Sequence, residues 1–260
     1  MIDNYKKLCT IFYDTDKPFP PHDEFLFYLS LCEEYQTDIL EPMCGSGRFL
    51  IPLLEKGFII DAFDASDSMI FSLKKKLAKK KLHLYNLAHC LFDEYVFRKK
   101  YNLIFIPSAS FGLFTLKHDS LSVLKKIFNN LHAGGCFAFE VETPAIFRKG
   151  GSEFNIISNK ILPVAGTDDL ILGSFFNRSY KENILEIICR YDFISKNQFL
   201  FSEQETIFVK LFSYHDILGM LSLVGFSDVA VYKNFERELF SLTDPLPDVL
   251  IVECRKHKNK

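Results

Sequence analysis

Two carboxylates and two glycines near the N-terminal third of the chain have the types and spacing of a ligand site. The stretch ILEPMCGSGRFLIPLLEKG, residues 39–57, places Glu41 just before a turn with Gly45 and Gly47, and Asp64 ends the next apolar run. Because glycine has no Cβ, such a turn lets a ligand approach the backbone closely. Glu41 would repel a pyrophosphate but attract an ammonium group, and Asp64 can accept hydrogen bonds from a ribose diol. These residues indicate a ligand with a ribose and a positive end.

The dinucleotide fingerprint G-x-G-x-x-G is incomplete in this turn. Leu50 stands where the third glycine belongs, and that glycine normally allows close packing of helix against strand. A nicotinamide or flavin cofactor is therefore disfavoured. S-adenosylmethionine, which combines adenosine, a sulfonium and an amino-acid head, fits the residues better, with S-adenosylhomocysteine as its product. An ordinary strand-to-helix turn without a ligand is the structural alternative.

Strand and helix signals alternate from about residue 38 to residue 144. Continuous apolar strands between helices indicate a parallel sheet buried on both faces. The expected strands are Asp38–Met43, Phe58–Asp64, Leu82–Leu87, Tyr101–Pro107 and Cys136–Val141, and the expected helices are Arg48–Lys56, 66–80 and Asp119–Leu131.

The pattern changes after Pro144. Residues 170–210 contain apolar runs separated by polar turns with no helix between them, which is typical of an antiparallel meander. A helix over 215–224 and strands over 226–233 and 249–254 follow. The expected fold class is α/β, a Rossmann-like seven-stranded, mostly parallel sheet with helices on both faces and an inserted antiparallel β lid. The expected parts are an N-terminal helical segment over the cofactor site (1–37), a core (38–144 and 211–260) and a substrate lid (145–210).

The segments EPMCGSGRFLIPLLEKGF and DAFDASDSMI resemble the class I S-adenosylmethionine-dependent methyltransferases, most of all their bacterial small-molecule branch. The signatures of that branch are similar to E-P-x-C-G-x-G-R and D-x-S-x-x-M. The resemblance implies a methionine-binding part, a ribose-binding acid and an adenine-binding part. The residues implied are Glu41, Gly45 and Gly47 for the methionine end, with Arg48 next to them, Asp64 for the ribose, and Ala65 and Met69 near the adenine; Cys44 is a further cofactor-binding residue.

The adenine contacts depart from the family pattern. After the third strand the family commonly has an acidic residue, whereas LAHCLFDEY places His89 there, with Cys90 beside it. His89 or a backbone group would contact the adenine, or Asp93 would do so in a shifted register. Pro107, at the end of the fourth strand, is expected near the methyl group because ligands bind at the carboxyl ends of such strands.

The residues after the fourth strand exclude several kinds of methyltransferase. Pro107-Ser108-Ala109-Ser110 lacks the Asp/Asn-Pro-Pro-aromatic signature of enzymes that methylate nucleic-acid amino groups. It also lacks the Pro-Cys pair of enzymes that attack a cytosine carbon. No metal-binding acid stands there, and no cysteine–histidine cluster has zinc spacing, so no metal is expected. The lysines of residues 74–81 are interpreted as a solvated helix face. Nucleic acid is therefore not an expected partner.

Methyl transfer is an in-line displacement that depends chiefly on positioning and water exclusion, so a base is weakly marked in any sequence. The candidate catalytic residues are Tyr13, Glu142 and His215; a buried aromatic, a surface acid and a helix cap are their structural alternatives. The lid is expected to offer a small polar or aromatic substrate the side chains of Phe175, Phe176, Arg178, Tyr180, Arg190 and Tyr191.

The sequence predicts a cytoplasmic S-adenosylmethionine-dependent methyltransferase that acts on nitrogen or oxygen of a small molecule. The alternatives are a non-catalytic S-adenosylmethionine-binding module and a methyltransferase with a protein substrate. Seven scattered cysteines and the absence of a signal peptide indicate a reducing compartment. No apolar run is long enough for a membrane span, and a homodimer through the lid sheet is a further expectation.

Overall fold

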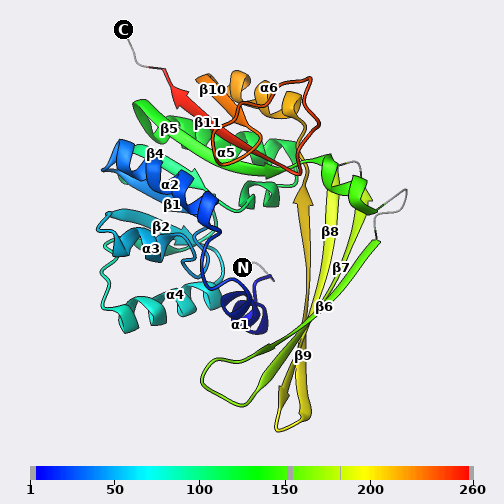
Figure 1. Ribbon diagram of the computed structural model, residues 1–260. Helices are drawn as coiled ribbons and strands as arrows, with labels where there is room; N and C mark the ends of the chain where they lie inside the picture. Colours follow the sequence, from blue (N-terminus) through cyan, green and yellow to red (C-terminus); the bar gives the residue numbers. More distant parts are fainter. Residues whose placement is uncertain (1–3, 151–154, 182, 258–260) are drawn as a thin grey trace.

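The computed structural model describes residues 4–150, 155–181 and 183–257. Seven strands form one sheet in the order β10-β11-β5-β4-β1-β2-β3, in which only β11 runs antiparallel to its neighbours (Figure 1). The predicted seven-stranded α/β sheet is therefore confirmed. Its strands are β1 (Ile39–Pro42), β2 (Ile60–Asp64), β3 (Leu87–His89), β4 (Tyr101–Ile106), β5 (Leu131–Glu142), β10 (Phe226–Tyr232) and β11 (Val249–Lys256).

Helices cover both faces of this sheet, because successive strand residues enter opposite cores. Ile104 and Phe137 belong to the cluster that includes residues of α5 and α6, whereas Leu103 and Ala138 belong to the cluster that includes residues of α2, α3 and α4. This alternation follows from the two-residue period of a strand. The helices are α1 (Lys7–Asp16), α2 (His22–Tyr35), α3 (Leu50–Glu55), α4 (Asp67–Lys80), α5 (Lys117–Asn130) and α6 (Tyr214–Val224), with 3-10 turns η1 (Ser110–Leu113) and η2 (Pro144–Gly150).

Three predicted boundaries near the site are wrong. The third strand is Leu87–His89, because α4 ends at Lys80 with Lys81 as a left-handed C-cap, and the following residues only connect to the sheet edge. The third helix begins at Leu50, not at Arg48, because the glycine turn extends to Phe49. The fifth strand begins at Leu131, and its two glycines lie inside it where the pairing with β4 shifts register.

A second sheet of four antiparallel strands leaves the core after η2 and extends well beyond it (Figure 1). Its strands are β6 (Asn155–Pro163), β7 (Leu170–Lys181), β8 (Ile184–Ser195) and β9 (Gln198–Lys210). The antiparallel sheet is confirmed, but β6 was not predicted, because the polar residues 158–160 interrupt its apolar pattern. Helix α1 packs against the inner face of the sheet through Leu8 and Phe12, which belong to one buried cluster with residues such as Ile171.

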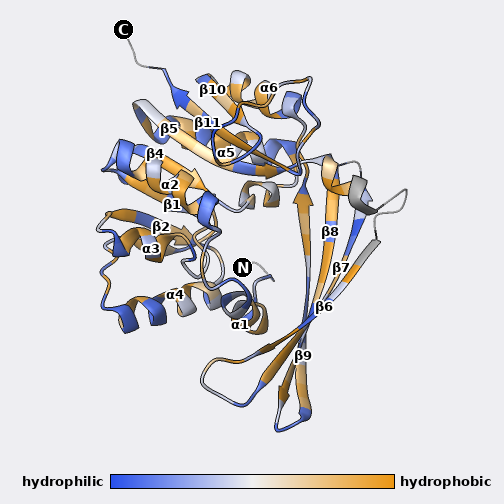
Figure 2. Ribbon diagram, in the orientation of Figure 1, coloured by the Kyte–Doolittle hydropathy of each residue, from blue (hydrophilic) through white to orange (hydrophobic). Residues whose placement is uncertain are grey.

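Helix α4 carries the lysine run on the outside of the molecule, where Figure 2 shows hydrophilic residues. Lys74, Lys75 and Lys79 are exposed, as the sequence predicts. Lys76 differs, since its Nζ lies 2.6 Å from Asp14 Oδ1 and joins α4 to α1. In the part of the chain that the structure describes, no helix combines the length and apolar character needed to cross a bilayer.

Candidate cofactor and acceptor site

The glycine turn holds the Asp64 carboxylate at the end of β2. The backbone N–H of Gly45 donates to Asp64 Oδ2 at 2.8 Å, and the N–H of Ser66 donates to Oδ1 at 2.8 Å. Burial raises the pKa of Asp64, while the N–H groups of Ser66 and Gly45 act in the opposite direction and stabilise the charged form. Each carboxylate oxygen can accept a further hydrogen bond. Asp64 is therefore oriented to accept two hydroxyl groups.

The two glycines of the turn serve different purposes. Gly47 has φ +85°, and a Cβ there would lie 2.6 Å from Leu73 Cδ1, so this glycine packs the turn against α4. Gly45 has φ +54°, and its Cβ would have only Met69 Sδ nearby, at 4.0 Å. Gly45 and Met69 both line a cavity. The space beside Gly45 is therefore open to a ligand.

Two cavities meet at Asp64. One, of about 330 Å³, reaches Gly45, Arg48 and Ser108, and the other, of about 300 Å³, reaches Cys90 and apolar residues at 91 and 92. Both include Tyr5, Met43, Asp64, Ala65 and Leu113 in their linings. A polar space, a central carboxylate and an apolar space thus follow one another, in the order of an amino acid, a ribose and an adenine.

Buried polar atoms behind the turn fit an amino-acid head. Glu41 Oε2 and Arg48 Nε are buried and have no hydrogen-bond partner in the described part of the chain. Arg48 Nη2 donates to Ser108 Oγ at 2.9 Å and lies 3.6 Å from Glu24 Oε2. Burial and the charge of Asp64 raise the pKa of Glu41. Arg48 lines the polar cavity, and an arginine suits a carboxylate. The residues present therefore fit the methionine part of S-adenosylmethionine.

Two buried glutamates, Glu24 and Glu140, accept hydrogen bonds from Ser108. The N–H of Ser108 donates to Glu24 Oε1 at 3.1 Å and to Glu140 Oε1 at 3.0 Å, and the Tyr28 hydroxyl donates to Glu140 Oε1 at 2.8 Å. Burial raises the pKa of both carboxyls, and the charge of Glu24 raises the pKa of Glu140 further. The side-chain hydrogen bond between the two carboxyls raises the pKa of Glu140 and lowers that of Glu24, so Glu140 is the member of the pair that favours the proton.

Replacing Glu140 with glutamine is expected to reduce the loss of stability with rising pH. Because the pKa of Glu140 is raised in the folded state, its stabilising contribution is complete below the ordinary glutamate pKa and is lost as pH rises through the raised pKa. Glutamine mimics the protonated acid. Between pH 5 and pH 8 the free energy of unfolding should fall by at least about 1 kcal/mol less in Glu140→Gln than in the wild type. Urea unfolding measures this, the exposed Glu33→Gln serves as control, and identical pH profiles would contradict the shared proton.

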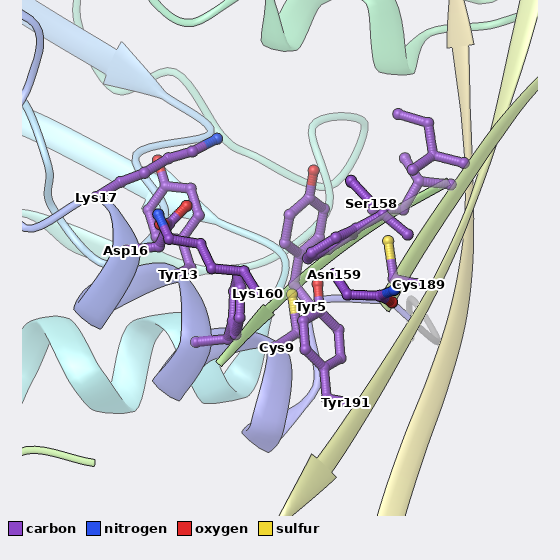
Figure 3. A pocket seen from close by; sticks show the side chains of 14 residues that line it. Tyr5, Cys9, Tyr13, Asp16, Lys17, Ser158, Asn159, Lys160, Cys189 and Tyr191 are labelled. Atoms are coloured by element: carbon purple, nitrogen blue, oxygen red, sulfur yellow. The ribbon is translucent and has the colours of Figure 1, made fainter. Parts of the chain in front are cut away.

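A third and larger cavity, of about 490 Å³, lies between α1 and the inner face of the antiparallel sheet (Figure 3). It shares Tyr5, Tyr13, Lys17 and Ile187 with the polar cavity beside Gly45. One face of α1, with residues spaced by three or four, and the residues Tyr5 and Lys17 that flank the helix supply one side of this cavity. The residues on that side are Tyr5, Cys9, Phe12, Tyr13, Asp16 and Lys17, and those from the sheet are Ser158, Asn159, Lys160, Phe175, Ile187, Cys189, Tyr191 and Ile207.

The structure brings six of the eleven predicted cofactor residues to the first two cavities. These six are Gly45, Arg48, Asp64, Ala65, Met69 and Cys90. Glu41, Cys44, Gly47 and Pro107 are buried and line none of the three cavities. His89 is exposed, with Nε2 3.1 Å from the Ala65 carbonyl, and Asp93 is exposed as well. Leu91 and Phe92 line the apolar cavity in their place.

The three catalytic candidates have different positions. Tyr13 lines both the polar cavity and the large cavity. Glu142 is half-buried and lines none of the three cavities; burial raises its pKa, and the nearby Lys17 lowers it. His215 is exposed on α6 and lines none of the three cavities either. Only Tyr13 lines the space where a methyl group would be transferred.

The lid residues divide by strand alternation. Phe175 and Tyr191 line the large cavity, whereas Phe176, Arg178, Tyr180 and Arg190 line none of the three. Neighbouring residues of a strand point to opposite faces, and the sequence does not say which face is inner.

Asp61, interpreted as a surface or helix-facing acid, is buried and accepts hydrogen bonds from Tyr101 Oη at 3.0 Å and Asn86 Nδ2 at 2.8 Å.

Several lining residues were missed, among them Tyr5, Lys17, Lys160 and Cys189. On α1, Cys9 carried a usable signal, since it lies four residues before Tyr13 and so shares its helical face, whereas Tyr5 and Lys17 flank the helix. Those on β6 and β8 carried none. In the described residues no group of three or more histidine, cysteine, aspartate or glutamate side chains could hold a metal ion.

Comparisons with known proteins agree with this geometry. No protein-family profile matches the chain. The chain is 24% identical over 131 residues to the Bacillus subtilis (strain 168) protein named "Putative methyltransferase YqeM". The matched residues make up 50% of this chain and 53% of that protein. The chain thus spans about half the length of this curated relative.

Solved structures match over nearly the whole chain. An S-adenosylmethionine-dependent methyltransferase from Clostridium acetobutylicum ATCC 824 has a TM-score of 0.77 at 16% identity, covering 97% of this chain and 99% of that one. The sugar N-methyltransferase KedS8 from Streptoalloteichus sp ATCC 53650 has a TM-score of 0.72 at 14% identity, covering 99% and 96%. The chain therefore has the fold of the class I S-adenosylmethionine-dependent methyltransferases, and the resemblance drawn from its sequence is confirmed.

Proposed function

We propose that this protein is an S-adenosylmethionine-dependent methyltransferase that acts on nitrogen or oxygen of a small molecule. The observation that carries the proposal is the position of Asp64. Its carboxylate is held by the N–H groups of Gly45 and Ser66, between an apolar and a polar cavity, and the polar cavity adjoins a third one. The three cavities, in this order, suit the adenosine, the methionine part and the methyl acceptor.

Each part of the site has a role in binding the cofactor. Asp64 would accept the two ribose hydroxyls, the apolar lining at 91 and 92 would cover the adenine, and Arg48 would bind the methionine carboxylate. When bound, S-adenosylmethionine supplies a methyl group whose leaving group, a sulfonium, is already activated. The protein then needs to align the acceptor and exclude water.

Tyr13 and Tyr5 would shape the place of transfer. Burial raises the pKa of both phenols, so both hydroxyls stay protonated at neutral pH. They can donate or accept hydrogen bonds to orient an acceptor but do not supply a phenolate base. An amine acceptor in its neutral form brings its own lone pair and loses its proton to solvent after transfer, so a nitrogen nucleophile needs no further base.

The large cavity favours catalysis over the two alternatives. A non-catalytic binding module predicts a crevice too shallow for a substrate, whereas about 490 Å³ adjoins the methionine space. A protein substrate predicts an open groove, whereas α1 and the antiparallel sheet cover this space (Figure 3). KedS8, a sugar N-methyltransferase of the same fold, also supports a small-molecule acceptor.

Calorimetric titration with S-adenosylmethionine and S-adenosylhomocysteine tests the proposal. Both are expected to bind at one site per chain with a Kd of about 1–100 µM, or −8 to −5.5 kcal/mol. NADH serves as the control ligand, because Leu50 and Glu41 disfavour a dinucleotide. Binding of NADH without binding of either S-adenosyl compound would refute the proposal.

A further inference from the structure

We propose that the methyl acceptor carries an anionic group, which Lys17 and Lys160 bind at one end of the large cavity, while its apolar or aromatic body lies against the rings farther in. This inference rests on the proposed function and names the acceptor class of that same site. Figure 3 shows Lys17, Asp16 and Lys160 gathered near Tyr13, with Cys9, Cys189 and Tyr191 farther along the cavity.

The charged groups of the lining favour an anion. Asp16, Lys17 and Lys160 are the charged residues among the described residues that line the cavity, and they sum to one positive charge. The remaining lining is neutral, since burial raises the pKa of Cys9, Cys189 and the lining tyrosines. A cationic acceptor would find only Asp16, which already forms an ion pair with Lys160.

Lys17 is the cation left for a ligand. No ion pair of Lys17 occurs in the described residues, and its Nζ lies 5.7 Å from the centre of the Tyr13 ring. The other charged groups that face it are Glu142 from β5, which interacts with it beyond ion-pair distance, and Arg48, which lies 5.9 Å from the same ring. Because Lys17 lines both the large cavity and the polar cavity, an anion bound to it lies close to the place of transfer.

Lys160, which forms an ion pair with Asp16, is a second cation that the acceptor can bind. The ion pair connects α1 to the edge strand β6, and both side chains line the cavity. An acceptor anion that enters between Lys17 and Lys160 competes with Asp16 for Lys160. The anion of the acceptor is expected to displace Asp16 from Lys160 in part, because an exposed ion pair is individually weak. Removing the Asp16 charge should therefore strengthen binding of an anionic acceptor.

Aromatic rings supply the wall for the acceptor's body. Phe12, Phe175 and Tyr191 form a cluster with centroids 5.4–5.8 Å apart, contributed by α1, β7 and β8. All three line the cavity. Rings in this arrangement suit a flat apolar or aromatic group, which gains dispersion and ring-packing energy there. The acceptor therefore has an apolar end and an anionic end, in the size range that about 490 Å³ permits.

Ligand-observed NMR on the S-adenosylhomocysteine complex tests the inference. The probes are a set of small aromatic carboxylic acids, their primary amides and the corresponding amines, which differ in charge but little in shape. The acids are expected to bind at least about tenfold more tightly than the amides and amines, as charge-assisted hydrogen bonds require. Lys17→Met should remove most of this preference, Lys17→Arg should retain it, and Asp16→Asn should increase it; the exposed Lys79→Met is the control.

The result that overturns the inference is equal or tighter binding of amides or amines, an acid preference unchanged in Lys17→Met, or no binding of any probe. S-adenosylhomocysteine binding is measured separately by calorimetry in each variant. If it is intact while the acids show no preference, the acceptor class is wrong and the proposed function stands. If S-adenosylhomocysteine itself does not bind the wild type, the proposed function fails.

Discussion

Replacing Asp64 with alanine is expected to weaken S-adenosylhomocysteine binding by about 100-fold, or about 3 kcal/mol. The substitution removes the acceptor of two ribose hydroxyls, and hydrogen bonds to a charged group contribute about 1.5–3 kcal/mol each. It also leaves the N–H groups of Gly45 and Ser66 without their partner. Calorimetric titration of the variant against the wild type measures the change.

Asp61 offers a matched control in the same strand. It points to the opposite face of β2, where it accepts hydrogen bonds from Tyr101 and Asn86. Asp61→Asn should lower stability but leave the Kd for S-adenosylhomocysteine within about twofold, while Asp64→Asn should weaken binding to a degree between wild type and Asp64→Ala. An unchanged Kd in a folded Asp64→Ala variant would remove the carboxylate from the ribose site.

Replacing Gly47 with alanine is expected to lower the free energy of unfolding strongly. The residue has φ +85°, which costs an L-residue about 1–2 kcal/mol. The new Cβ would also lie 2.6 Å from Leu73 Cδ1 and 3.1–3.2 Å from two atoms of Ile51, and such overpacking costs about 1–3 kcal/mol. The free energy of unfolding should therefore fall by about 2–5 kcal/mol.

Gly57 separates the two contributions. It has φ +91°, but a Cβ there would have no atom within 4 Å, so Gly57→Ala should lose only about 1–2 kcal/mol. Urea unfolding of both variants gives the difference, and calorimetry should show weakened cofactor binding for Gly47→Ala alone. Equal losses of stability in the two variants would mean that the turn does not pack tightly against α4.

The cofactor side of the site was predictable because its signal is local. Gly45, Gly47 and Asp64 lie within one strand–turn–helix–strand unit, in which parallel pairing of β1 with β2 fixes their relation. The order of strand and helix signals was likewise enough for the seven-stranded sheet. The buried pair of Glu24 and Glu140 was not predictable, because these residues come from α2 and β5, and nothing near either residue in sequence shows that they meet.

The acceptor side depends on long-range packing and on strand phase. Lys17 directly follows α1 and Lys160 lies on β6, and these two elements approach each other only when the antiparallel sheet folds back over α1. A shift of one residue along the strand decides whether Phe175 or Phe176 faces the cavity. The sequence does not reveal which one does, because apolar residues occur on both faces of the strand. The homodimer through this sheet and the cytoplasmic location stay predictions.

The structure of the complex with S-adenosylhomocysteine would show whether Asp64 binds the ribose of the cofactor. We expect the ribose hydroxyls within hydrogen-bond distance of Asp64, the adenine in the apolar cavity, and the thioether sulfur facing the cavity lined by Tyr13 and Lys17. A ligand bound with its ribose away from Asp64, or with its sulfur facing away from that cavity, would contradict the proposed cofactor and acceptor sites.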